Sequence, residues 1–234
     1  MCEALGVVER SRPTARTPVY IESGSKRVFA SAVDWPGWCR SGRDEGAAVE
    51  ALGAAALRYS AVPSEAGVAF PRQASGGFEV VERLAGSATT DFGAPGAIAS
   101  GDGQPLTGKQ AQRLTKLVVA SWAILDRVVA GAPARLRKGP RGGGRDRDAI
   151  AEHVLSAEAA YARKLGLRLA QPELGDRKAV AAARDEIVQL LRVASTGSPL
   201  VEKGWPPRYA ARRIAWHALD HAWEIEDRSA PGPS

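Results

Sequence analysis

The pattern of apolar positions changes about 100 residues into the chain. Two short runs of β-branched and aromatic residues, 18–22 and 27–33, flank the segment Ser23-Gly24-Ser25-Lys26. Such runs around a Gly/Ser turn are typical of a β-hairpin. Apolar residues then recur at helical spacing between 44 and 59, and 78–84 has the composition of one more strand. The first part is therefore predicted to be α+β, in the order strand, strand, helix, strand.

The second part has helical periodicity throughout. Leu114, Leu117, Val118 and Leu125 form one apolar stripe, and three further amphipathic stretches cover about 147–167, 176–194 and 209–227. Four helices of this length, joined by loops of intermediate length, are typical of a four-helix bundle. We therefore expect an all-α four-helix bundle after the α+β part.

A Gly/Pro/Ser-rich segment separates the two patterns, and this composition is typical of a boundary between domains. The expected organisation is an N-terminal tail (1–16), a small α+β domain (17–95), a linker (96–105), the bundle (106–229) and a C-terminal tail (230–234).

Composition restricts the class of protein. The chain is 44% hydrophobic and 25% charged, the usual mixture of a globular protein. No apolar run approaches the roughly 18 residues of a membrane span. Cys2 and Cys39 are the only cysteines, too few for a disulfide framework or a cysteine-based zinc site. The first residues lack the basic start and apolar stretch of a secretory signal, so we expect a cytoplasmic protein without a membrane partner.

The net charge of +6 is uneven: residues 1–100 carry 10 Lys/Arg and 11 Asp/Glu, whereas residues 101–234 carry 22 and 15. Much of the excess lies in one Gly-rich stretch, at Arg135, Arg137, Lys138, Arg141, Arg145 and Arg147. A basic patch of this kind can bind phosphate or nucleic acid. No aromatic residues are interleaved to stack on bases, so a solvated loop is the favoured interpretation and nucleic acid is not expected as a partner.

The chain has three histidines, and all of them fall on predicted helices of the second part. His217 and His221 are four residues apart, which places them on one helix face with Cβ atoms about 5–6 Å apart. His153 lies among apolar neighbours on another helix. If the two helices pack together, the three rings can converge on a metal ion with an open coordination position.

Other interpretations of the histidines stay open. A His-x-x-x-His pair also arises by chance, and the three residues would then be ordinary core histidines. Imidazole suits zinc, nickel, copper and iron, so the residues do not name the metal. No glutamate follows His217, so the His-Glu-x-x-His motif of zinc proteases is absent.

The second part resembles the DinB-like family of metal-binding four-helix bundles. The likeness lies in the Gly-rich loop 142–144, the helix entrance Ile150-Ala151-Glu152-His153 with Glu158, and the last-helix pair His217 and His221. It covers about 105–228, slightly over half the chain. The resemblance implies that all three histidines bind a divalent metal, usually zinc or nickel.

The resemblance also implies an activity. DinB-like relatives are mostly S-transferases or isomerases that use a low-molecular-weight thiol. The Ala, Gly and Arg richness of this chain is typical of a GC-rich genome, and mycothiol is a plausible thiol in such a genome. A metal with three neutral ligands keeps its positive charge and favours the thiolate form of an approaching thiol. The expected partners are this thiol or a small-molecule substrate. Arg141 and Arg145 are candidates for holding an anionic part of the thiol.

Three further residues are candidates near the ligands. Tyr161 follows His153 by a little over two helical turns. Asp220 and Glu224 each stand three residues after a histidine, where either carboxylate can orient an imidazole. Each of the three is also a common solvated or capping residue.

The first part is similar to HicB-like domains, in which strands lead through a Pro-Gly-Cys segment to an acidic helix start. Asp34-Trp35-Pro36-Gly37-Trp38-Cys39 followed by Asp44-Glu45-Gly46 fits this outline, with Trp38 inserted before the cysteine. No DNA-binding element follows, so an antitoxin role is not expected, and Trp35 and Trp38 are expected to pack beneath the helix. The alternative function is a non-catalytic binding or regulatory protein, with a HicB-like recognition domain and a structural or homodimerising bundle.

Overall fold

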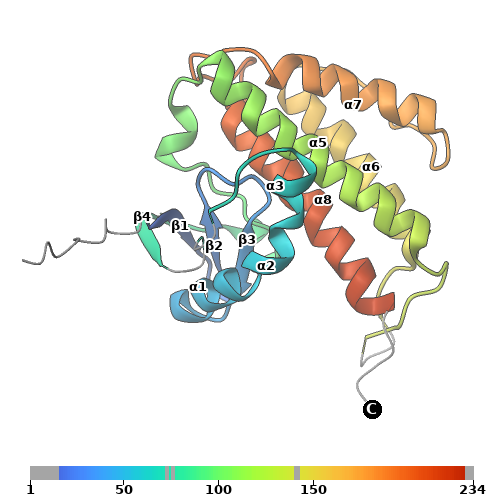
Figure 1. Ribbon diagram of the computed structural model, residues 1–234, viewed down its shortest axis with the longest axis horizontal. Coiled ribbons are helices and arrows are strands. Elements are labelled where there is room, and N and C mark those ends of the chain that lie inside the picture. Colours follow the sequence, from blue (N-terminus) through green and yellow to red (C-terminus); the bar gives the residue numbers. More distant parts are fainter. Residues whose placement is uncertain (1–15, 72–73, 75–76, 140–142, 230–234) are drawn as a thin grey trace, which may run out of the picture.

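A computed structural model of the protein describes residues 16–71, 74, 77–139 and 143–229 (Figure 1). A small mixed sheet comes first and a helical region follows. The strands are β1 (Thr17–Ser23), β2 (Val28–Ala32), β3 (Cys39–Gly42) and β4 (Phe78–Ala85). The shorter helices are α1 (Glu45–Ala54), α2 (Ala56–Tyr59), α3 (Ala61–Glu65), α4 (Ala88–Phe92) and the 3-10 turn η1 (Ser100–Gly103). The long helices are α5 (Gly108–Gly131), α6 (Arg147–Lys164), α7 (Arg177–Leu191) and α8 (Pro207–Ser229). Apart from Arg16, the predicted tails lie outside the described residues.

The predicted order of strand, strand, helix, strand is wrong in one respect, because β3 lies between the hairpin and α1. The strand has only four residues and a polar middle, Arg40-Ser41, so it lacks the apolar alternation of a strand. The Pro36-Gly37 turn folds it back onto β2, with Cys39 opposite Ser31. Gly42 ends the strand where a Cβ would lie 2.4 Å from the Ala48 nitrogen, so the close approach of α1 requires glycine.

The predicted helix over 44–59 is present in two pieces. Asp44 caps α1 by accepting a hydrogen bond from the Ala47 nitrogen at 2.8 Å. The helix α1 ends at Ala54, and after the single residue Ala55, which caps its end, α2 begins. Leu52 and Tyr59 nevertheless both remain fully buried.

The sheet has the strand order β3-β2-β1-β4, with β4 parallel to β1 and the other neighbours antiparallel. Alternate residues of β1 point to opposite faces. Val19 and Ile21 join the core beneath α1, and Trp38 stacks there on Tyr59 with ring centroids 5.4 Å apart. The expectation that Trp35 and Trp38 pack in this core is confirmed, since both are buried.

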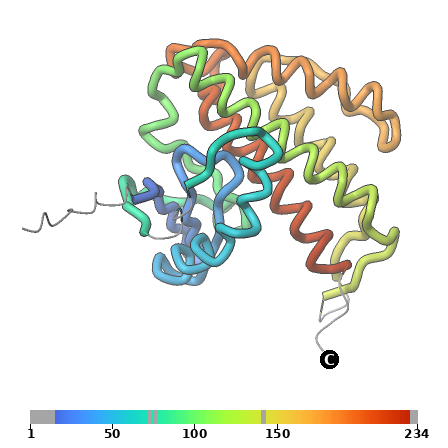
Figure 2. The backbone as a smooth tube through the Cα atoms, viewed as in Figure 1, coloured from blue at the N-terminus to red at the C-terminus, as the bar shows by residue number. Residues whose placement is uncertain are grey.

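The opposite face of the sheet is covered by α8. Phe29 of β2 meets Trp216 edge-on, with ring centroids 6.3 Å apart, and Cys39 packs in the same cluster. Figure 2 shows α8, in red, running between the N-terminal part of the chain and the other long helices. This helix therefore belongs to both parts of the molecule.

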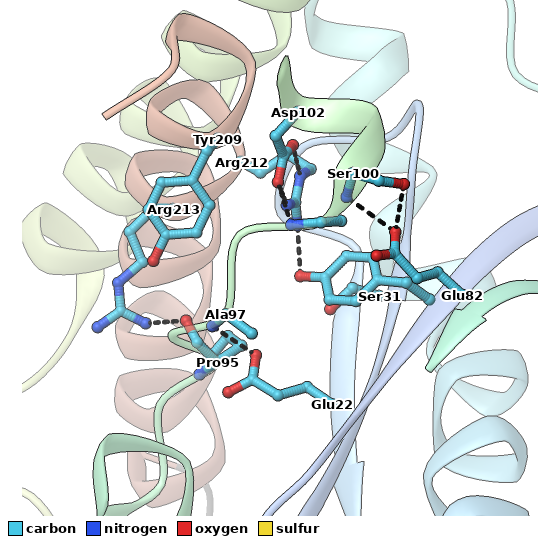
Figure 3. A network of polar contacts seen from close by, with 12 residues as sticks. Glu22, Ser31, Glu82, Pro95, Ala97, Ser100, Asp102, Tyr209, Arg212 and Arg213 are labelled. Atoms are coloured by element: carbon cyan, nitrogen blue, oxygen red, sulfur yellow. Dashed lines mark hydrogen bonds and ion pairs between the residues drawn. The ribbon is translucent and has the colours of Figure 1, made fainter. Parts of the chain in front are cut away.

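Residues 96–105, whose composition predicted a linker, are packed against both parts. The fully buried Glu22 carboxylate of β1 accepts hydrogen bonds from the Gly96 and Ala97 nitrogens, each at 2.9 Å. Asp102 of η1 pairs with Arg212 of α8, which also donates to the Tyr20 hydroxyl (Figure 3). We call Tyr20, Asp102 and Arg212 the junction cluster. Because all three are buried, the segment joins the sheet to α8 rather than spacing them apart.

Side chains cap the N-terminal ends of two of the long helices, α5 and α7. Thr107 and Gln110 form a reciprocal capping box at the start of α5, and Asp176 caps α7 through the Ala179 nitrogen at 2.9 Å. Along the described chain, no helix combines the length and the apolar character that crossing a membrane requires.

Candidate metal centre

The structure brings the three histidines together. His153 lies on α6, and His217 and His221 lie one turn apart on α8. One ring nitrogen from each lies within 4.8 Å of the others, and the Nε2 atoms of His153 and His217 are 3.3 Å apart. We call these residues the histidine cluster. In the described part of the chain, no other set of His, Cys, Asp or Glu side chains gathers in this way.

Small residues allow this convergence. Ala210, Ala211, Ala215, Ala218 and Ala222 of α8 are all buried, so neighbouring elements can approach its backbone closely. Ile150 and Val154 of α6, on either side of His153 in the sequence, are also buried and hold this part of the helix in the core. The cluster thus lies at a packed helix contact and not on a mobile loop.

Burial favours the neutral form of two histidines of the cluster, since it lowers the pKa of both His217 and His153. His217 is 6% exposed, and burial, followed by the nearby His221 and Arg213, lowers the pKa of its imidazole well below the ordinary value. The pKa of the half-buried His153 is lowered as well, first by burial and then by His221. Neutral imidazoles offer lone pairs, which is the form that metal binding requires.

Glu224 orients one of the rings. Its Oε2 lies 2.9 Å from His221 Nδ1, and this hydrogen bond is the main reason that the pKa of the carboxyl is lowered. The other oxygen accepts a hydrogen bond from Arg228 at 2.7 Å, and Arg228 Nε donates to the Arg137 carbonyl at 2.9 Å. With Nδ1 engaged by the carboxylate, Nε2 is the nitrogen of His221 that remains to bind a metal.

Asp220, the other carboxylate candidate, is placed differently. Its Oδ1 lies 3.4 Å from the Arg40 guanidinium of β3, and Arg40 also stacks 3.7 Å above the Trp223 ring. Burial raises the pKa of this carboxyl, against the lowering effect of Arg40. Asp220 therefore joins the helix to the sheet, whereas Glu224 contacts the histidine cluster.

Tyr161 lies beside the cluster without a polar contact to it in the described structure. Its ring meets His217 edge-on at 5.6 Å, Trp205 packs 5.1 Å from it, and the Arg213 guanidinium lies 5.6 Å over its ring. Burial raises the pKa of its hydroxyl. These residues form an aromatic wall on one side of the cluster.

The basic stretch is largely bonded within the protein. Lys138 pairs with Asp146 at 2.6 Å, and Arg147 pairs with Asp148 at 2.7 Å. Arg145 is exposed and makes no ion pair with the described residues, while Arg141 lies outside them. This supports the solvated-loop interpretation for the paired residues and leaves Arg145 available to a ligand.

Three arginines around the site, Arg228, Arg213 and Arg40, were not among the residues predicted from the sequence. Arg228 was detectable, because it stands four residues after Glu224, where a helix brings opposite charges together. Arg40 and Arg213 had no comparable signal, since their contacts to Asp220 and Tyr161 depend on how separate elements pack.

The donor set fits a divalent metal. Three neutral imidazoles with one orienting carboxylate are a common protein arrangement for zinc and for other borderline cations. The Nε2 atoms of His153 and His217, 3.3 Å apart, are close enough for both nitrogens to bind one ion. With three protein donors, one or more coordination positions remain for an external ligand.

Comparison with known proteins adds no relative. No protein-family model matches the chain, and neither a curated protein nor a solved structure matches it significantly. The histidine cluster is therefore the feature of the molecule that points to a function.

Proposed function

We propose that the protein is a divalent-metal-binding enzyme of the DinB-like type that acts with a low-molecular-weight thiol, as an S-transferase or a related enzyme. The observation that supports this most directly is the 3.3 Å approach of the Nε2 atoms of His153 and His217, with His221 beside them. The lone pairs of two imidazole nitrogens repel each other at this distance unless one ring donates a hydrogen or both bind a cation.

Zinc and nickel are the proposed metals, since both accept imidazole ligands. A divalent ion held by neutral ligands keeps its charge and lowers the pKa of a thiol that approaches it. The protein's own residues would fix the geometry. Glu224 would hold His221 in one tautomer, and Arg228 would hold Glu224.

The surroundings of the cluster suit an anionic or thiol-bearing ligand. Tyr161 and Trp205 would exclude water on one side, which strengthens electrostatic interactions within the site. Arg145, exposed in the loop that precedes α6, would contact an anionic part of the thiol, for which mycothiol is our proposed example.

The test is the metal content of purified, untagged protein, measured by elemental mass spectrometry beside His217→Ala. We expect near-stoichiometric zinc or nickel that is absent from the variant. Circular dichroism shows whether the variant folds, and His221→Gln repeats the test with a more conservative change. A protein that contains no metal and takes up neither zinc nor nickel would refute the proposal.

A thiol screen then tests the enzymatic half of the proposal. The metal-loaded protein is titrated with mycothiol, bacillithiol and glutathione, with Arg145→Ala as a variant. Tighter binding of one thiol, weakened in the variant, supports the role of Arg145, whereas unchanged affinity would remove it.

A HicB-like recognition role is the less favoured proposal. The two faces of the sheet are covered by α1 and α8, so a partner could reach the sheet mainly at its edges, β3 and β4. A His153→Ala protein that loses metal but keeps a binding partner would favour this second function.

A further inference from the structure

A second candidate site lies away from the histidine cluster. A groove of about 860 Å³ runs between α5 and α7, with the end of α3 at its side, and no histidine lines it. Its size is within the roughly 300–1,000 Å³ of ligand pockets. Nothing in the proposed function uses this groove.

One part of the groove is apolar and open to solvent. Val119 of α5 and Val193 after α7 line it and are 44% and 55% exposed, which is high for valine. Ala123 and Val188 continue the same wall. An exposed apolar groove of this kind is typical of a surface that contacts a ligand.

The other part is cationic. Lys116 and Arg192 line the groove, are exposed and form no ion pair with the described residues. Glu65, the acidic residue of the lining, is already paired with Arg127 at 3.2 Å. The groove therefore presents two positive charges without a compensating anion.

These features are ordered along the groove. Leu106 pairs with Ser195 in an antiparallel bridge, which sets the start of α5 beside the end of α7. Along the chain, Gln112 and Val193 are nearer to this bridge than Lys116 and Arg192 are, and Ala123 and Val188 are farther from it. The two cations thus lie in the middle stretch of the lining, with apolar residues before and after them along the chain.

We propose that this groove binds a single-chain anionic amphiphile, such as a fatty-acid carboxylate. The carboxylate would pair with Arg192 and Lys116, since a guanidinium matches a carboxylate in geometry and charge. The chain would cover Val119, Ala123 and Val188. A second copy of the protein fits less well, because a symmetric interface would bring the same two cations together from both sides.

The experiment is calorimetric titration of the metal-free protein with dodecanoate, below its micelle concentration, beside dodecyltrimethylammonium. We expect one dodecanoate to bind, at least tenfold more tightly than the cationic amphiphile of equal chain length. Equal binding of both, or no binding of dodecanoate, would overturn the proposal.

Variants locate the site. Lys116→Gln with Arg192→Gln is expected to weaken dodecanoate at least tenfold. The matched control, Lys178→Gln with Arg163→Gln, removes the same charge from exposed positions outside the groove and should change affinity less than twofold. Similar losses in both double variants would place binding elsewhere and overturn the proposal.

A substitution in the apolar part completes the test. Val119→Asp should also abolish dodecanoate binding, while His217→Ala should leave it unchanged. Light scattering that shows a dimer in the unmodified protein and a monomer for Val119→Asp would identify the groove as an interface between copies instead.

Discussion

The junction cluster and the histidine cluster share helix α8, but they satisfy their polar groups in different ways. In the junction cluster, the Arg212 guanidinium donates hydrogen bonds to the Asp102 carboxylate and to the Tyr20 hydroxyl. The buried cation is therefore paired with an anion and with a neutral acceptor. In the histidine cluster, three like groups face each other, with the Nε2 atoms of His153 and His217 3.3 Å apart.

This difference indicates that the junction cluster stabilises the fold and that the histidine cluster binds a ligand. A complete set of buried partners needs nothing from outside and stabilises one arrangement of the chain. An incomplete set of lone-pair donors becomes satisfied when a cation binds. Removing a residue should therefore affect mainly stability at the junction and mainly ligand binding at the histidines.

The largest effect on stability is expected from Asp102→Ala. This change leaves the Arg212 guanidinium buried without its anion, which should lower the free energy of unfolding by about 3–5 kcal/mol. Urea denaturation measures it. The double variant Asp102→Leu with Arg212→Met should lose less than the single one, because no unpaired charge remains. A comparable loss of metal affinity in Asp102→Ala would show that the two clusters are not independent.

A smaller effect is expected from Glu224→Gln, which replaces the carboxylate beside His221. Metal affinity should fall about 10–100-fold, the usual effect of removing a partner that orients a ligand. Competition with a chromogenic chelator measures this. Glu226→Gln is the matched control on the same helix, since Glu226 pairs with Arg58 at 2.6 Å away from the histidines. If both variants bind metal equally well, Glu224 has no orienting role.

The stability of the metal-free protein should depend on pH in a defined direction. Burial holds the pKa of His217 well below the value of about 6.5 in an unfolded chain, so the unfolded state takes up a proton first. The free energy of unfolding should then fall as the pH drops from 7.5 to 5.5. Urea denaturation with a chelator present tests this, and His217→Gln should show a shallower fall. An identical fall in both proteins would contradict the assignment to His217.

The smallest effect is expected from Asp220→Asn. The ion pair with Arg40 is partly exposed, and pairs of this kind contribute up to about 1 kcal/mol. Metal affinity should change less than twofold, because the Asp220 carboxylate is engaged with Arg40 instead of a histidine. A loss of metal affinity as large as that of Glu224→Gln would show that both carboxylates act on the cluster.

Sequence patterns predicted the features that depend on local order. Helical periodicity located the four long helices, and the hairpin and β4 followed from their β-branched residues. The histidines were identified because they are scarce and because His217 and His221 have helical spacing. These signals depend on neighbours within one element.

The remaining features depend on contacts between elements. The short, polar strand β3 exists because β2 offers it a partner. Asp220 and Glu224 occupy equivalent sequence positions relative to the two histidines, and only the position of Arg40 on the sheet separates their roles. Likewise, the Gly/Pro-rich composition of residues 96–105 is typical of a linker, and only the contacts with Glu22 and Arg212 show that the segment is packed against the sheet and α8.

The double coverage of the sheet has a consequence for synthesis of the protein. Tyr20 and Arg212 are 192 residues apart, yet they are direct neighbours across the second face of the sheet. At roughly 5–20 residues per second, about 10–40 s separate the translation of these two residues. During that interval the hairpin can form, but the face of the sheet that carries Phe29, Cys39 and Glu22 stays uncovered, because α8 has not yet been made. The nascent chain is thus most exposed to aggregation or chaperone binding at this face, until its last long helix is made.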